Sequence, residues 1–193
     1  MRHRSGRASS ETGEFVPFVC GRVGPVVVRD AASADAPALS RIHGETWEHT
    51  YLGQVPDAVA DDGIARARDR DWSEHSDLRL RLGGGVLVVV EDREVVGFCE
   101  YGPTEDADDD PRRVGHIMRL FVHPPHRSRG GGRLLLEAAC ARLAAGGCEN
   151  VTLWTLEAED NLAHGFYAHL GWTLERVHRT DDPDDIRYRR QLP

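Results

Sequence analysis

The sequence predicts one α/β (α+β) domain, with a mixed, mostly antiparallel central sheet of about six or seven strands flanked by about four helices. Three observations predict this fold. Three β-branched apolar runs follow one another between residues 86 and 122, as in an antiparallel meander. Apolar runs then alternate with segments of helical period. The 193 residues, of which 40% are hydrophobic, suffice for one core but not for two full domains.

The chain divides into a loosely attached or disordered tail, residues 1–24, and one domain, residues 25–193. The tail mixes Arg, Ser, Gly and Glu without a period, and the apolar run from Val26 predicts the first strand. Ser33 then has the position and the chemistry of a helix N-cap. The segment 59–72, rich in arginine and aspartate, predicts one surface helix or two short ones.

A hairpin and a third strand form the meander. Residues 86–90 and 95–101 are apolar and rich in valine, and the Asp-Arg pair between them can make a tight turn. The acidic loop 105–110 leads to a third strand over residues 114–122.

The C-terminal half alternates helix and strand. Helical patterns cover residues 133–145 and 161–170, and each is followed by glycine. Short strands are predicted over residues 151–156, 172–178 and 186–192, the last two as a hairpin.

The charge balance limits the function classes. The chain has 24 basic residues, all of them arginine, against 32 Asp and Glu, which gives a formal net charge of −8. This balance argues against a nucleic-acid binder that relies on a basic surface. Without lysine, Schiff-base catalysis and a P-loop phosphate site are excluded.

The cysteines and the apolar runs predict a cytoplasmic protein. The four cysteines form no Cys-x-x-Cys pair and no disulfide framework. Cys99 is interpreted as a core residue, because no pattern links it to a base. No run approaches the roughly 18 apolar residues that a membrane helix needs, so no membrane contact is expected.

The most informative stretch is a strand end followed by a glycine loop and a helix. It reads Leu120-Phe121-Val122-His123-Pro124-Pro125-His126-Arg127-Ser128-Arg129-Gly130-Gly131-Gly132-Arg133, and we call residues 127–133 the glycine loop. Glycines let backbone N–H groups approach a ligand, and a helix N-terminus adds unpaired donors, so the loop can hold a diphosphate. The arginines of the loop supply counter-charge, with a further contribution from Arg112, Arg113 and Arg119.

These residues resemble the GCN5-related N-acetyltransferase (GNAT) superfamily. The glycine loop fits that family's acyl-CoA motif, Gln/Arg-x-x-Gly-x-Gly/Ala, after a strand that ends in Leu-Phe-Val-His-Pro. The stretch Glu159–Trp172, EDNLAHGFYAHLGW, is similar to the family's second signature. The resemblance covers residues 26–192 and implies the GNAT fold.

The resemblance also implies site residues. Acetyl-CoA is the implied co-substrate, with its pyrophosphate on the glycine loop and its pantetheine arm along Leu120, Phe121 and Val122. The Val122 N–H would polarise the thioester carbonyl. Asn161 would touch the pantetheine arm, and Tyr167 would protonate the departing thiolate.

Other interpretations of these residues remain open. Tyr167 can be an aromatic packing residue, and Asn161 can be a helix N-cap. The amine acceptor must lose a proton before it attacks, so a base or a water chain is needed. The candidates are His116, which period two puts on the same face as Leu120, and Glu100 in the neighbouring strand.

Weaker signals come from an aromatic pair, two acidic runs and four histidines. Trp47 and Tyr51 lie four residues apart on a predicted helix and fit core packing or an acceptor pocket equally. The acidic runs 105–110 and 181–185 are solvated loops or, if they flank a cleft, attract cationic acceptors. No metal is expected, because the histidines that could be imagined as ligands lack metal-site spacing. These histidines are His43, His49, His123 and His126.

The sequence therefore predicts an acetyl-CoA-dependent N-acetyltransferase that transfers an acetyl group directly, in a ternary complex, to a primary amine of a small molecule or peptide. A non-catalytic acyl-CoA sensor and an acyltransferase for longer acyl-CoA are the alternatives. The resemblance also implies a homodimer as one possible assembly.

Overall fold

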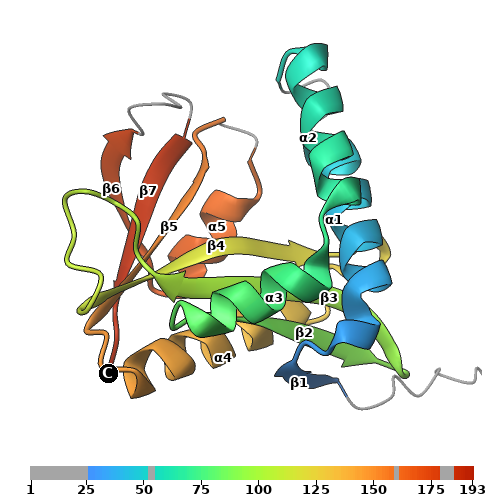
Figure 1. The fold of residues 1–193 in the computed structure, drawn as a ribbon. Helices are drawn as coiled ribbons and strands as arrows, with labels where there is room; N and C mark the ends of the chain where they lie inside the picture. The colour runs from blue at the N-terminus through green and yellow to red at the C-terminus, as the bar shows by residue number, and fades with distance from the viewer. Residues whose placement is uncertain (1–25, 52–54, 159–160, 179–184) are drawn as a thin grey trace, which may run out of the picture.

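The computed structural model describes residues 26–51, 55–158, 161–178 and 185–193, which form a seven-stranded sheet with helices on both faces (Figure 1). The strands are β1 (Val27–Asp30), β2 (Gly85–Glu91), β3 (Glu94–Pro103), β4 (Val114–Val122), β5 (Asn150–Leu156), β6 (Thr173–His178) and β7 (Asp185–Gln191). The α-helices are α1 (Ala36–Tyr51), α2 (Asp57–Asp69), α3 (Trp72–Arg81), α4 (Gly131–Ala145) and α5 (Ala163–His169).

The strand order β1-β2-β3-β4-β5-β7-β6 confirms the mixed sheet and the meander. Within the described residues, β4 and β5 are the one parallel pair, and every other neighbouring pair is antiparallel. The predicted terminal hairpin forms, but β7 inserts between β5 and β6. The turn between β2 and β3 is tight, because Asp92 and Arg93 have positive φ angles of 50° and 69°, as a two-residue hairpin turn of type I′ requires.

Two helix boundaries depend on carboxylate caps. The segment 59–72, predicted as one surface helix or two short ones, forms one helix, α2, and α3 begins at its last residue and continues beyond it to Arg81. The Asp71 carboxylate separates the two helices by accepting two hydrogen bonds of 3.0 Å from the first turn of α3. The prediction for Ser33 is wrong. Ser33 lies inside a 3-10 turn, and the Asp35 carboxylate instead accepts a hydrogen bond of 2.7 Å from the Ala32 N–H.

Two hydrophobic clusters occupy the two faces of the sheet. Helix α4 covers β2, β3 and β4 on one face, and α1 and α3 cover the opposite face (Figure 1). Leu135, Leu136 and Cys99 belong to the α4-side cluster, and the complete burial of Cys99 confirms its core role. Trp72 and Phe98 belong to the cluster under α1 and α3.

A β-bulge in β4 changes which side chains face each helix layer. The register to β3 shifts at Met118, which has no residue opposite it. Ile117 and Leu120 therefore both pack in the α4-side cluster, although they are three residues apart. The alternation of side chains between the two faces of the sheet therefore shifts by one residue at the bulge.

Helices α1 and α2 pack closely where an aromatic ring meets a glycine. Trp47 of α1 lies against Gly63 of α2, where an added Cβ would come within 2.3–2.8 Å of three ring atoms. Trp47 is therefore a packing residue between the two helices, and the side chain of Tyr51 lies outside the described residues.

The close approach at Gly63 makes a testable prediction. Gly63→Ala should lower the free energy of unfolding by about 1–3 kcal/mol, because the new methyl group forces the Trp47 ring to move. Urea denaturation measures this change. Gly165→Ala on α5 is the matched control, since nothing lies within 4 Å of its added Cβ and alanine favours the helix. Equal stability of both variants would contradict the packing described.

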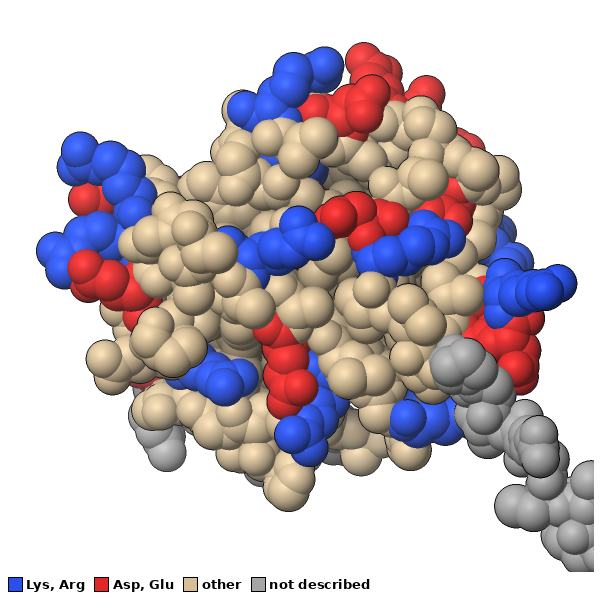
Figure 2. Space-filling model, turned by 90° about the horizontal axis from the view of Figure 1, so that it is seen from below, with Lys and Arg blue, Asp and Glu red and all other residues tan. Residues whose placement is uncertain are grey.

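The charged surface is mixed on the face that α4 forms. Figure 2 shows Arg and Asp or Glu side chains interspersed there, and ion pairs join Arg133 to Glu137 and Arg142 to Asp30. The acidic excess is therefore not concentrated on this face. Among the described residues, no helix is long and apolar enough to cross a membrane.

Candidate functional site

The sheet opens between β4 and β5. The two strands pair from Val114 opposite Asn150 to Ile117 opposite Leu153, and their described remainders, residues 118–122 and 154–156, do not pair with each other. The bulge at Met118 marks the point of divergence. The second half of β4 therefore presents an unpaired edge toward β5.

The backbone of Val122 faces this opening. The next residue, His123, donates its N–H to the carbonyl of Val96 in β3 at 2.9 Å. Because successive residues of a strand turn their N–H and C=O groups to opposite edges, those of Val122 and Leu120 point toward β5. An N–H directed into this gap has the geometry of an oxyanion donor.

The glycine loop reverses the chain tightly before α4. Ser128 and Gly130 have φ angles of 61° and 89°, in the left-handed region that favours glycine. None of the N–H groups from Ser128 to Arg133 donates a hydrogen bond to any described part of the chain. The α4 N-terminus thus begins at Gly131, earlier than predicted, with a row of unpaired donors suited to a diphosphate.

The arginines of the glycine loop already have partners. Arg127 donates from Nε to the Val122 carbonyl at 3.1 Å, which ties the loop to the strand end. Arg129 contacts Glu91 at 3.2 Å, and Arg133 contacts Glu137 at 2.8 Å. Arg129 and Arg133 are partly neutralised by these carboxylates, whereas the partners of Arg127 among the described residues are the neutral Val122 carbonyl and Thr50 hydroxyl. Arg127 therefore keeps its charge, and the unpaired backbone N–H groups add to its capacity to bind an anion.

Glu91, at the end of β2, is a site residue that no sequence motif predicts. Its carboxylate is buried and receives His126 Nδ1 at 2.6 Å as well as Arg129. The hydrogen bond from His126 lowers the pKa of Glu91, although partial desolvation opposes it. Glu91 thereby holds the glycine loop on the sheet.

Three predicted segments meet at Gly132. A Cβ placed there would lie 3.5 Å from Val122 and 3.6 Å from Phe166 of α5. The next residue, Tyr167, is buried and packs against Trp172 and Tyr188, with ring centroids 5.9 and 5.5 Å away. The strand end, the glycine loop and α5 therefore border one site. The Tyr167 ring packs in the core, as one of its two interpretations expects, and the catalytic role of its hydroxyl stays a prediction.

Asn161 joins the end of β5 to the start of α5. Its Nδ2 donates to the Thr155 hydroxyl at 3.0 Å and to the Leu156 carbonyl at 2.7 Å, and its Oδ1 accepts from the Ala163 N–H at 3.0 Å. The side chain thus works as a local cap. Its contact with pantetheine stays a prediction.

His116 lies on the opposite face of β4 from the one predicted. The bulge at Met118 shifts the alternation, so His116 shares a face with Arg119 rather than with Leu120. Its Nδ1 lies 2.8 Å from the buried Thr152 hydroxyl of β5. The tautomer in which Nδ1 donates to Thr152 puts the basic lone pair on Nε2.

Glu100, the other base candidate, is the centre of a buried cation cluster. Its fully buried carboxylate contacts Arg119 at 2.5 Å, Arg79 at 2.6 Å and His75 at 2.9 Å. Burial opposes ionisation, but the hydrogen bond from His75 and the charges of Arg119 and Arg79 lower the pKa of Glu100 to about 2. A carboxylate with this pKa is a weak proton acceptor at neutral pH. The i, i+4 spacing of His75 and Arg79 on α3 was a signal that could have revealed their shared role.

The acidic loop 105–110 is not a loose solvated run. Asp106 accepts from the Trp154 indole at 3.0 Å, Asp108 contacts Arg187 of β7 at 2.7 Å, and Asp109 contacts Arg189 at 2.8 Å. Three carboxylates lie close enough together to hold a metal ion, yet these arginines and the indole already occupy them. The negative charge of this run is therefore largely compensated. Of the second run, 181–185, four residues lie outside the described residues.

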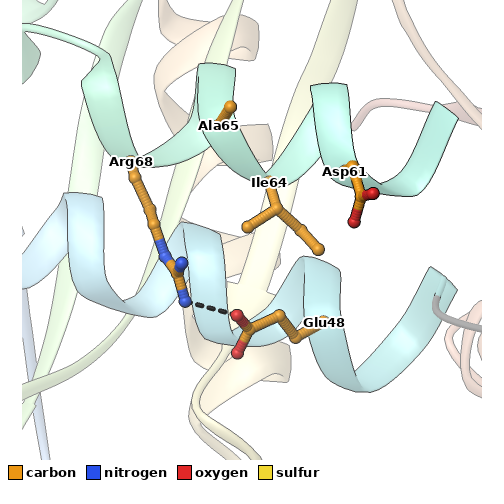
Figure 3. Close-up of a pocket in the computed structure, with 5 residues that line it drawn as sticks. All are labelled: Glu48, Asp61, Ile64, Ala65 and Arg68. Atoms are coloured by element: carbon orange, nitrogen blue, oxygen red, sulfur yellow. Dashed lines mark hydrogen bonds and ion pairs between the residues drawn. The ribbon is translucent and has the colours of Figure 1, made fainter. Parts of the chain in front are cut away.

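An open pocket of about 560 Å³ lies between α1 and α2 (Figure 3). Glu48 and Arg68 form an ion pair across it, and Asp61, Ile64 and Ala65 complete its lining. None of the predicted catalytic or cofactor-binding residues lines this pocket.

The chain is similar to acetyltransferases. The family model described as the acetyltransferase (GNAT) family matches residues 40–172. A mycothiol acetyltransferase of Kineococcus radiotolerans is 36% identical over 132 residues, which are 64% of this chain and 40% of that protein. An L-methionine sulfoximine/L-methionine sulfone acetyltransferase of Salmonella typhimurium is 27% identical over 150 residues, which are 77% of this chain and 81% of that protein. The chain thus spans less than half the length of the Kineococcus relative.

A solved structure has the same fold. The PaiA N-acetyltransferase of Thermoplasma acidophilum, in complex with coenzyme A, matches 87% of this chain and 99% of that one with a TM-score of 0.71 and 19% identity. At this identity the likeness shows the fold. Because the family model covers well over half of the sequence, the chain belongs to the acetyltransferase (GNAT) family.

Proposed function

We propose that this chain is an acetyl-CoA-dependent N-acetyltransferase that transfers the acetyl group directly to a primary amine bound in the same ternary complex. The observation that carries the proposal is the row of unpaired N–H groups from Ser128 to Arg133, beside the open edge of β4 at Val122. Acetyl-CoA supplies an acetyl thioester when it is bound. The similarity to proteins named acetyltransferases supports the same reaction.

Each residue has one task in this proposal. The N–H groups of the glycine loop bind the diphosphate, and the Val122 N–H donates to the thioester oxygen as negative charge develops there. The Tyr167 hydroxyl gives its proton to the thiolate that leaves. His116, directly or through water, takes the proton from the attacking amine, and Glu100 holds the cations around it rather than acting as the base.

Titration calorimetry of acetyl-CoA into the wild-type protein and Gly132→Asp tests the cofactor site. The new Cβ has room, since its nearest neighbours are 3.5 and 3.6 Å away, but the carboxylate repels the diphosphate. We expect the Kd to rise by about 100-fold or more, equivalent to roughly 3 kcal/mol.

Ala145→Asp is the matched control, because it adds the same charge to an exposed position at the far end of α4. Its Kd should equal that of the wild type. Failure of the wild type to bind either acetyl-CoA or a longer acyl-CoA would overturn the proposed function. Binding of longer acyl-CoA alone would instead support the alternative donor.

A further inference from the structure

Arg70, between α2 and α3, is a partly buried guanidinium without a carboxylate partner in the described part of the chain. Its NH1 lies 3.2 Å from His75 Nδ1, and its guanidinium carbon lies 5.6 Å from the centroid of the Trp72 ring. Its Nε is buried and makes no hydrogen bond to any described residue. A charge withdrawn from water without a counter-ion is costly, so proteins rarely retain one without a use.

The side chains beside Arg70 that are not exposed hold more positive than negative charge. Arg79 and Arg119 lie in the same cluster, and the one buried carboxylate there, Glu100, already contacts both of them. Burial and the charge of Arg119 lower the pKa of Arg70. The cluster can therefore accommodate a further anion.

Neutral polar atoms without partners lie on α1 and at the start of α3, and two of them, on His43 and Trp72, adjoin the same cluster. His43 Nδ1, Thr46 Oγ1 and Trp72 Nε1 are buried and make no hydrogen bond to the described residues, and each side chain belongs to a residue less than 5% exposed. The His43 ring lies 5.6 Å from the Trp72 ring. Burial, together with the charges of Arg119 and Arg70, lowers the pKa of His43 to about 3, so its ring is neutral at physiological pH. Buried polar atoms of this kind are ordinarily satisfied, and a bound ligand can satisfy them.

We propose that Arg70 and Arg119 bind a carboxylate of the acceptor, so that the substrate is an amino acid or another small amine that carries a carboxylate. This inference rests on the proposed function and specifies its substrate class. Arginine suits the role, because its planar donors match a carboxylate in a bidentate pair.

The position of the cluster agrees with this role. Arg119 precedes Val122 by three residues of β4, about 10 Å along the strand. It lies on the same face of β4 as His116, opposite the face that α4 covers. The acceptor would thus enter from the α1 and α3 side, with its carboxylate at the arginines and its amine toward the β4 edge.

A ligand can reach Arg70 from outside. Arg70 and His75 line an open pocket of about 270 Å³, together with Asp71, Glu74, Leu78 and Arg81. Asp71 already caps α3, and Glu74 is exposed. The compensated acidic loop 105–110, in contrast, offers little attraction to a cationic acceptor.

The test is an acceptor screen that follows thiol release from acetyl-CoA. The panel contains the twenty L-amino acids, the C-terminal amide of each one, and spermidine as a polycation. The amine of an amide is less basic and reacts more readily, so a preference for the free acid reports recognition of the carboxylate. We expect free acids to be acetylated with a kcat/KM about 10- to 100-fold above that of their amides.

Arg70→Gln should raise the KM for the best acid by about 10- to 100-fold, leave kcat nearly unchanged and have no effect on its amide. Its melting temperature should not fall, because the substitution removes an uncompensated charge. Arg66→Gln on α2, an exposed position, is the matched control and should behave like the wild type.

Absence of transfer to every carboxylate-bearing amine, a preference for amides or spermidine, or an Arg70→Gln variant with an unchanged KM would each overturn the inference. The proposed function would still stand after any of these results if the wild type binds acetyl-CoA and Gly132→Asp weakens that binding. The two proposals are therefore separable.

Discussion

Tyr167→Phe is expected to lower kcat by about 10²- to 10⁴-fold while the Kd for acetyl-CoA changes little. The substitution removes a hydroxyl and keeps the ring, which packs against Trp172 and Tyr188. Stability should therefore be nearly unchanged, and the loss reports the missing proton donor. Steady-state kinetics of thiol release, with the best acceptor from the screen, gives the measurement.

Tyr188→Phe is the matched control for this experiment. Its ring lies 5.5 Å from that of Tyr167, and its hydroxyl is hydrogen-bonded to His164 at 2.9 Å. The same atom is thus deleted from a neighbouring, equally buried phenol that has no part in the proposed reaction. Equal turnover for Tyr167→Phe and the wild type would remove Tyr167 from the mechanism and leave it a packing residue.

Glu100→Gln is expected to lower the free energy of unfolding by about 3–5 kcal/mol. The carboxylate is fully buried against Arg119, Arg79 and His75, and its loss leaves Arg119 without a carboxylate among the described residues and Arg79 with only the exposed Glu105. Chemical denaturation at pH 7 measures the change. Glu137→Gln, which breaks the exposed pair with Arg133 on α4, is the control and should cost less than about 1 kcal/mol.

The pH dependence provides a second readout for Glu100. Its pKa in the folded protein, about 2, lies below the value near 4.3 of an unfolded glutamate. The folded state therefore prefers the ionised form, and this contribution, about 3 kcal/mol, is complete above the unfolded pKa and declines as the pH falls toward 2. The difference in free energy of unfolding between the wild type and Glu100→Gln should accordingly become smaller as the pH falls from about 4.5 to about 2. A difference that stays constant over this range would show that folding does not change the pKa of Glu100.

Several elements could be predicted because their signals are local. The β2–β3 hairpin follows from two valine-rich runs around an Asp-Arg turn, and α4 from an apolar helical face between glycines. The glycine loop could be located for the same reason, since glycine content and a following helix are contiguous in the chain. Helix α3 was harder, because its pattern merges with that of α2 and the boundary depends on the cap at Asp71.

The face of His116 could not be predicted. Period-two alternation holds only while both strands advance together, and the bulge at Met118 depends on the pairing of β3 with β4. The i, i+4 spacing indicates that His75 and Arg79 share one face of α3, but not that this face meets Glu100, which lies more than 20 residues later in the chain. The pairing of the acidic loop with Arg187 and Arg189 likewise joins segments about 80 residues apart.

The sequence by itself determined the α/β class, the order of the elements, the glycine loop with its row of unpaired N–H groups, and the resemblance to acetyltransferases. These depend on periodicity, turn chemistry and contiguous motifs, which act over a few residues. The tertiary structure alone decided which charges are compensated. It pairs the acidic loop with Arg187 and Arg189 and the glycine-loop Arg129 with Glu91, yet leaves Arg70 without a carboxylate among the described residues, because ion pairing depends on which distant side chains meet in space.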